Sequence, residues 1–149
     1  MKTIKILFAL LPLFLVFASC SNDDDEPANN NSEVITQLLG EWTLDGYTAD
    51  GGAFEAIPEE ITIIYEFKTG GIVTISYTYD DDDEEYEDLV KNGTYTVNNN
   101  TVTIRIDGEN VPHAINQLTA TSMRLAARVD VDDDEGLEDA VLYFTKVTS

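Results

Sequence analysis

The stretch Ile61–Tyr79 (ITIIYEFKTGGIVTISYTY) carries the pattern that decides the fold. Apolar and polar residues alternate on both sides of the segment Thr69-Gly70-Gly71. Such alternation is typical of half-buried β-strands, and the two glycines indicate a tight turn between them. The stretch therefore predicts a β-hairpin with one apolar face. That face comprises Ile61, Ile63, Tyr65 and Phe67 before the turn and Val73, Ile75, Tyr77 and Tyr79 after it.

The rest of the chain from residue 40 onward repeats this strand pattern. Six further runs are expected to be strands: residues 40–47, 94–97, 101–106, 111–118, 122–129 and 140–147. Asn98-Asn99-Asn100 separates two of them, and asparagine tolerates the positive φ of tight hairpins. No crossover helix is expected between strands, and only a short helix from Ser32 to Leu39 precedes them. We expect an eight-stranded antiparallel up-and-down barrel; a two-sheet β-sandwich is the alternative.

The N-terminus indicates export and lipidation. Lys2 and Lys5 precede an apolar run, residues 6–18, which is shorter than the roughly 20 residues that span a bilayer. The segment Phe17-Ala18-Ser19-Cys20 resembles the lipobox of bacterial lipoproteins, in which the cysteine is acylated and becomes the new N-terminus. We expect residues 1–19 to be a signal peptide, residues 20–31 an acylated Cys20 with a disordered acidic tether, and residues 32–149 the domain.

The charge of the chain excludes one class of partner. After loss of Lys2 and Lys5, 29 acidic residues face six basic ones, a net charge of −23. Such a surface repels nucleic acid and does not lie flat on an anionic membrane leaflet. Contact with the bilayer is expected only through acyl chains on Cys20, and the protein is expected to be a monomer.

The residues from Leu39 to Val147 resemble the lipocalin-like domains of Bacteroidetes lipoproteins. The resemblance includes a Gly40-Glu41-Trp42 start, the strand Tyr65-Glu66-Phe67-Lys68 and a Tyr143-Phe144-x-Lys146 ending. It implies that Trp42 lies at the closed end of a barrel with a cation, here Lys146, stacked on it. It also implies anchoring to the outer membrane. The acidic cluster after Cys20 resembles a surface-export signal, so exposure at the cell surface is expected, with a periplasm-facing position as the alternative.

The inward aromatic side chains are candidates for lining a ligand pocket. A lipocalin-like barrel implies a binding module for a small, partly apolar ligand. The candidates are Tyr65, Phe67, Tyr77, Tyr79 and Tyr95. An enzyme is not expected, because the chain has one histidine, its one cysteine is assigned to acylation, and no nucleophile-elbow or phosphate-loop motif is present.

Acidic residues collect in alternate loops, which share one end of an up-and-down barrel. They could serve solubility, attract a cationic ligand or basic partner, or bind calcium, which prefers carboxylate oxygens. A surface interaction or structural protein with such an acidic rim is the alternative function. The candidate calcium ligands are Asp81, Asp83, Asp130, Asp132 and Asp134. Asp130-x-Asp132-x-Asp134 begins like an EF-hand loop, but Glu135 and Val141 stand where that loop needs glycine and glutamate.

Overall fold

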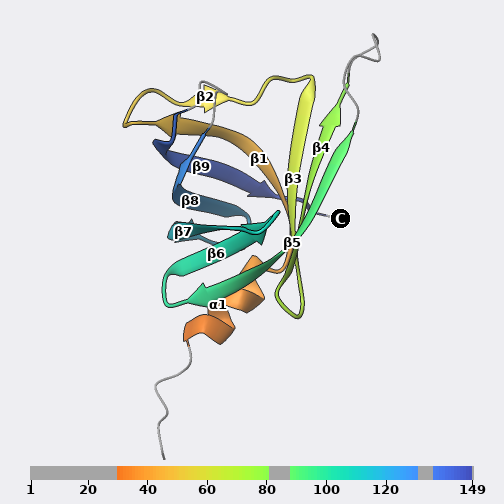
Figure 1. Cartoon of the computed structure of the whole chain (residues 1–149), viewed down its shortest axis with the longest axis vertical. Coiled ribbons are helices and arrows are strands. Elements are labelled where there is room, and N and C mark those ends of the chain that lie inside the picture. The colour runs from red at the N-terminus through yellow and green to blue at the C-terminus, as the bar shows by residue number, and fades with distance from the viewer. Residues whose placement is uncertain (1–29, 81–87, 131–135, 149) are drawn as a thin grey trace, which may run out of the picture.

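The computed structural model describes residues 30–80, 88–130 and 136–148. These residues form one helix and nine strands that follow each other in a single antiparallel sheet (Figure 1). The elements are α1 (Asn30–Leu38), β1 (Gly40–Ala49), β2 (Glu55–Ala56), β3 (Ile61–Lys68), β4 (Ile72–Tyr79), β5 (Leu89–Asn98), β6 (Thr101–Ile106), β7 (Glu109–Leu118), β8 (Ser122–Val129) and β9 (Glu138–Lys146).

The sheet closes because its first long strand also pairs with its last. β1 pairs with β9 from Trp42↔Lys146 to Ala49↔Ala140, so β1 and β3 to β9 form a barrel of eight strands. Closure confirms the predicted up-and-down barrel over the β-sandwich. Closure also means that each of the eight long strands pairs with a neighbour on both of its edges.

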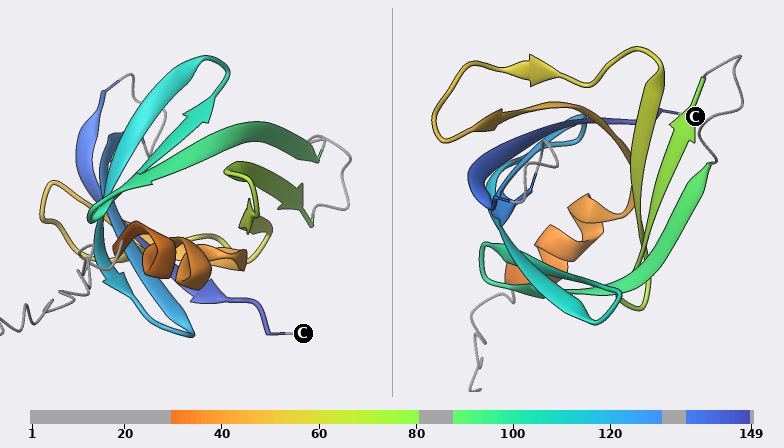
Figure 2. Two further views of the ribbon diagram at one scale, coloured as in Figure 1. Left: turned by 90° about the horizontal axis from the view of Figure 1, so that it is seen from below. Right: turned by 45° about the horizontal axis from the view of Figure 1, so that its top comes forward.

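Short turns connect the strands at the end of the barrel where α1 lies. β5 and β6 are joined through Asn99, whose φ of 53° confirms the positive φ expected of the asparagine turn. β3 and β4 turn through Gly70 and Gly71, with φ of 80° and 74°. Figure 2 shows α1 lying across this end, which we call the closed end.

α1 is tied to the closed end by its C-terminal carbonyl groups. The Trp42 indole donates a hydrogen bond to the Leu38 carbonyl oxygen at 2.8 Å, and the Lys146 ammonium donates one to the Gln37 carbonyl oxygen at 3.3 Å. Leu38 and Trp42 are fully buried. The helix therefore acts as a plug whose apolar side completes the core.

The opposite end of the barrel, the open end, carries the longer connections. β1 pairs with β3 only from Gly40 to Thr43, and further along β1 the two-residue strand β2 takes the place of β3. We call residues 50–60 the strap. Its aromatic residue Phe54 packs against Gly46, where a Cβ would lie 2.5 Å from the ring. The strap was not expected to form a strand, because two residues carry no readable periodicity.

β5 begins earlier than the sequence suggested. Residues 89–94 pair with β4 and residues 93–98 pair with β6, so the two pairings overlap only at Gly93 and Thr94. A Cβ on Gly93 would lie 2.1 Å from the Arg105 carbonyl oxygen, so only glycine permits this close approach. The first half of β5 does not alternate between buried and exposed residues, because Leu89 and Val90 are both exposed. The sequence pattern therefore did not predict a strand there.

Candidate functional site

The barrel interior is filled only near the closed end. The largest fully enclosed side chains there include Trp42, Phe67, Phe144 and Met123. The rings of Phe67 and Tyr95 meet edge to face with centroids 5.1 Å apart, and the Tyr95 hydroxyl donates a hydrogen bond to the Lys68 carbonyl oxygen at 3.1 Å. These contacts form a solid floor below the open half.

A first cavity of about 230 Å³ lies in the open half, between β3 to β5 on one side and β6 to β8 on the other. Its deep walls are apolar, and its upper edge is polar. It is lined by Tyr65, Ile75, Tyr77, Lys91, Ile104, Ile106, Asp107, Glu109, Val111, His113 and Val129.

A second cavity of about 330 Å³ lies beside the first, toward β1, β9 and the strap. It is lined by Leu44, Tyr47, Ile57, Ile63, Tyr65, Tyr77, Val129, Asp130 and Leu142. Tyr65, Tyr77 and Val129 belong to both linings, so these three side chains stand between the two spaces. The strap closes part of this cavity with Ile57, whose backbone N–H donates to the Asp45 carbonyl oxygen at 3.0 Å.

Tyr65 and Tyr77 present neutral hydroxyl groups to these cavities. Burial, and to a smaller extent the nearby Tyr77 hydroxyl, raises the pKa of Tyr65 well above its usual value of 10. Burial also raises the pKa of Tyr77, with Tyr79 as a smaller cause. Both side chains are therefore uncharged hydrogen-bonding groups at physiological pH.

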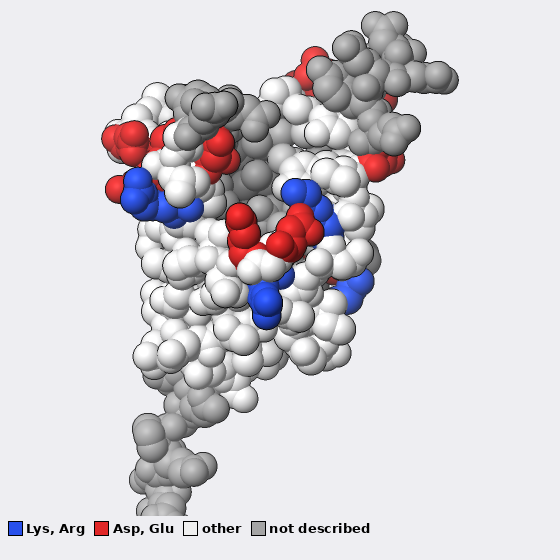
Figure 3. Space-filling view, viewed as in Figure 1, with Lys and Arg blue, Asp and Glu red and all other residues white. Residues whose placement is uncertain are grey.

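The upper edge of the first cavity carries charge of both signs. Lys91 on β5 forms an ion pair with Asp107, with Nζ and Oδ2 3.6 Å apart. Asp107 and Gly108 form a two-residue hairpin turn with φ of 53° and 92°, and Glu109 follows directly. Figure 3 shows acidic side chains over the upper part of one face, away from the closed end.

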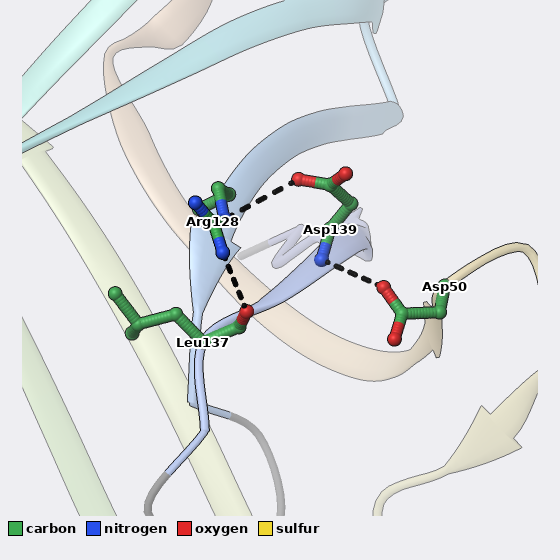
Figure 4. A network of polar contacts seen from close by, with 4 residues as sticks. All are labelled: Asp50, Arg128, Leu137 and Asp139. Carbon is green, nitrogen blue, oxygen red and sulfur yellow. Dashed lines mark hydrogen bonds and ion pairs between the residues drawn. The ribbon is translucent and has the colours of Figure 1, made fainter.

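A network of polar contacts joins β8, the start of β9 and the loop after β1 (Figure 4). Arg128 donates to the Leu137 carbonyl oxygen at 3.2 Å and forms an ion pair with Asp139 at 3.7 Å. The backbone N–H of Asp139 in turn donates to a carboxylate oxygen of Asp50 at 3.2 Å. Since Arg128 and Asp139 are exposed, the ion pair contributes little energy, and the network mainly positions the loop ends.

His113 is a buried member of the first cavity's wall. Its Nδ1 lies 2.9 Å from the Val111 carbonyl oxygen. Burial lowers the pKa of His113 below its usual value, while hydrogen bonds with the backbone of Val111 and Val102 oppose this shift. The imidazole is thus a neutral side chain held by the backbone of its own sheet.

Of the five candidate lining residues, the structure brings two together at the cavities. Tyr65 and Tyr77 line both spaces. Phe67 and Tyr95 lie in the floor near the closed end, and Tyr79, half-buried at the end of β4, is in neither lining. Alternation identifies the inward face of a strand, but the height of a residue along the barrel depends on the register between strands.

The two residues expected at the barrel floor lie in contact. The Lys146 ammonium stands 4.9 Å from the centroid of the Trp42 ring, and Trp42 has no exposed surface. Cys20 lies outside the described residues.

Four of the five candidate calcium ligands, Asp81, Asp83, Asp132 and Asp134, also lie outside the described residues. The fifth, Asp130, is exposed and lines the second cavity. Within residues 30–80, 88–130 and 136–148, no group of three or more histidine, cysteine, aspartate or glutamate side chains is arranged to hold a metal ion.

Sequence reasoning missed most of the cavity lining. Ile104, Val129 and His113 line the first cavity, whereas the sequence predicts them only as strand residues. Their positions along the chain could have indicated this, because each residue is closer in sequence to an acidic loop than to a short turn. The part of the chain that the structure describes contains no helix long and apolar enough to cross a membrane.

Comparisons with known proteins agree with this architecture. Residues 38–125, more than half of the chain, match the model of the lipocalin-like domain family. The chain therefore belongs to the lipocalin-like domain family, as the Gly-x-Trp start and the strand motifs suggested. A search of curated proteins found no match.

Two solved structures from Bacteroides share the fold. A lipocalin-like protein from Bacteroides uniformis is 16% identical, with a TM-score of 0.55, and the alignment covers 74% of this chain and 99% of that one. An uncharacterized protein from Bacteroides eggerthii is 14% identical, with a TM-score of 0.54 and the same coverages. At these identities the likeness concerns the fold alone.

Proposed function

We propose that this chain is a membrane-anchored binding protein that holds a small, partly apolar ligand in the open half of its barrel. The observation that carries the proposal is the uneven filling of the interior. Aromatic and aliphatic side chains pack solidly at the closed end, whereas two adjoining cavities of about 230 and 330 Å³ remain at the open end. Mostly apolar walls with a few convergent polar groups are typical of small-molecule sites.

Val129 provides the most direct test, because it lines both cavities. We take the chain from residue 20 onward with Cys20→Ser, expose it to a lipid and metabolite extract, and examine it by native mass spectrometry. We expect a retained small molecule on the parent protein and its loss in Val129→Trp, whose larger side chain fills the shared space. Val90→Trp is the matched control, since Val90 is 56% exposed on β5 and faces neither cavity.

The outcome is decisive in both directions. Retention by Val90→Trp but not by Val129→Trp supports the proposal. A parent protein that retains nothing from the extract, or a Val129→Trp variant that retains the same molecule, would contradict it.

The anchoring part of the proposal rests on the sequence before the fold. Cys20 follows a basic start and an apolar run, and the chain enters the fold at Asn30, at the closed end. Acyl chains on Cys20 would thus hold the barrel by its closed end. The nine residues between Cys20 and α1, residues 21–29, can extend for about 30 Å, and the open end lies opposite this point of attachment.

This part has its own test in the cell that makes the protein. We expect Cys20→Ala to move the protein from the membrane fraction to the soluble fraction, because more than one acyl chain is needed for stable anchoring and none can be attached. Ser21→Ala, the neighbouring substitution, should leave it in the membrane fraction. A Cys20→Ala protein that stays with the membrane would sink the anchoring proposal.

A further inference from the structure

Two hydroxyl groups in the open half have no hydrogen-bond partner among the described residues. Neither Tyr65 nor Tyr77 has a hydrogen-bond partner for its hydroxyl within the described residues. Within the described residues, every side-chain oxygen or nitrogen that is fully enclosed has a hydrogen-bond partner. Since these two hydroxyls have none, they are not fully enclosed and face accessible space. They are positioned to bind a polar group of a ligand.

The fixed charges around the cavities favour one sign of ligand charge. Among the described residues, Lys91 is the one positively charged side chain in either lining, and its ammonium is paired with Asp107. Glu109 at the same edge and Asp130 at the second cavity add negative charge. The whole chain carries a net charge of −21, so the field outside the opening is negative as well.

Among the described lining residues, an anionic ligand could pair only with Lys91, whose ammonium already has a carboxylate neighbour in Asp107. A carboxylate would have to displace Asp107 from Lys91 and lie near Glu109. An ammonium group, by contrast, can contact carboxylates at the edge, the phenol oxygens of Tyr65 and Tyr77, and the faces of their rings. The isoleucine and valine side chains deeper in the first cavity match an apolar body.

We infer that the site takes a small cationic amphiphile, with its apolar body between Ile75, Ile104 and Val129 and its ammonium group toward Tyr65, Tyr77 and the carboxylates of Asp107 and Glu109. This inference rests on the proposed function and names the chemical class of its ligand. The first cavity has the volume of roughly eight water molecules at about 30 Å³ each, so a compact ligand fits it.

Three probes of nearly the same shape test the charge preference: 2-phenylethylammonium, 2-phenylethanol and phenylacetate. Each is titrated by NMR into the chain from residue 20 onward with Cys20→Ser at low ionic strength. We expect the ammonium to bind about tenfold more tightly than the alcohol and the carboxylate to bind most weakly. The advantage of the ammonium should shrink as salt is added.

The double variant Asp107→Asn/Glu109→Gln removes both carboxylates while keeping side-chain size, and asparagine tolerates the positive φ at position 107. It also leaves Lys91 without its ion-pair partner. We expect the order of affinities to reverse, with phenylacetate tightest. Glu33→Gln/Glu41→Gln makes the same change of charge on α1 and at the start of β1 and should keep the original order.

Each result separates this inference from the proposed function. If 2-phenylethanol binds and Val129→Trp abolishes its binding, but the ammonium has no advantage, the proposed function stands and this inference is overturned. It is also overturned if both double variants weaken ammonium binding equally, because the cation is then attracted only by total charge. If none of the probes binds in a manner blocked by Val129→Trp, this inference is overturned, and the extract experiment alone decides the proposed function.

Discussion

At the scale of single residues, Lys146 and Trp42 show how one charged side chain can complete a core. The ammonium of Lys146 lies over the indole ring and also donates to the end of α1. The resemblance to lipocalin-like domains implied that Lys146 stacks on Trp42. The sequence could not predict its second contact, because that contact depends on where the helix lies.

We predict that Lys146→Met lowers the free energy of unfolding by about 1 kcal/mol, since the cation–π contact and the bond to α1 are lost while the apolar stem is kept. Urea unfolding followed by the fluorescence of Trp42, the chain's single tryptophan, measures this change. Lys68→Met is the control, because its ion pair with Glu66 is exposed and contributes little. Equal losses for the two variants would contradict the assigned role of Lys146.

His113 predicts a pH dependence of stability. Its folded-state pKa lies below its unfolded-state value, because burial disfavours the charged ring. The unfolded chain therefore binds a proton first as the pH falls below about 6.5. Stability contributed by neutral His113 is present above that pH and is lost as the pH falls toward the folded-state pKa.

The test compares wild type with His113→Gln between pH 7.5 and 5.5. Wild type should lose up to about 1 kcal/mol more of its free energy of unfolding than the variant over this range. Because the chain has only one histidine, the difference between the two proteins isolates this group from the carboxylates. Parallel pH profiles would show that His113 titrates alike in both states.

At the scale of elements, two glycines set the path of β1 and β5. Gly93 allows β5 to change partners inside the closed barrel, and Gly46 allows the strap to cross β1. The sequence predicted strands on both sides of these positions. It could not show that the missing side chains matter, since each close approach depends on how the next segment of the chain folds back.

We predict different costs for the two glycine substitutions. Gly93→Ala forces apart two strands of the barrel and should lower the free energy of unfolding by about 3 kcal/mol, whereas Gly46→Ala displaces only the strap and should cost about 1 kcal/mol. Chemical denaturation measures both values, and limited proteolysis should cut the strap faster in Gly46→Ala. The reverse order of costs would show that the strap, not the barrel, limits stability.

At the scale of the whole molecule, the open half of the barrel combines an incomplete core with an excess of negative charge. Like charges repel each other more in the compact state than in the unfolded chain. The fold tolerates this repulsion because no acidic side chain is buried among the described residues, so water and salt screen the charges. The same arrangement gives the opening its preference for cations.

We predict that salt stabilises this protein. Raising NaCl from about 0.01 M to about 0.1 M shortens the screening length from about 30 Å to about 10 Å, so the melting temperature should rise by several degrees. Calorimetry measures the rise, and CaCl₂ at matched ionic strength is the control. A larger effect of calcium would indicate a specific site, and a fall in melting temperature with NaCl would contradict the account of repulsion.

From the sequence one could predict the eight strands, their inward faces, the asparagine and glycine turns, and the lipocalin-like family. These features depend on periodicity and on local backbone conformation, which neighbouring residues encode. The three-dimensional structure was needed to show that Phe67 and Tyr95 belong to the solid floor, whereas Tyr65 and Tyr77 line a cavity. The height of a residue in the barrel follows from the registers of all the strand pairs together, including the closing pair β1–β9, and no local pattern contains it.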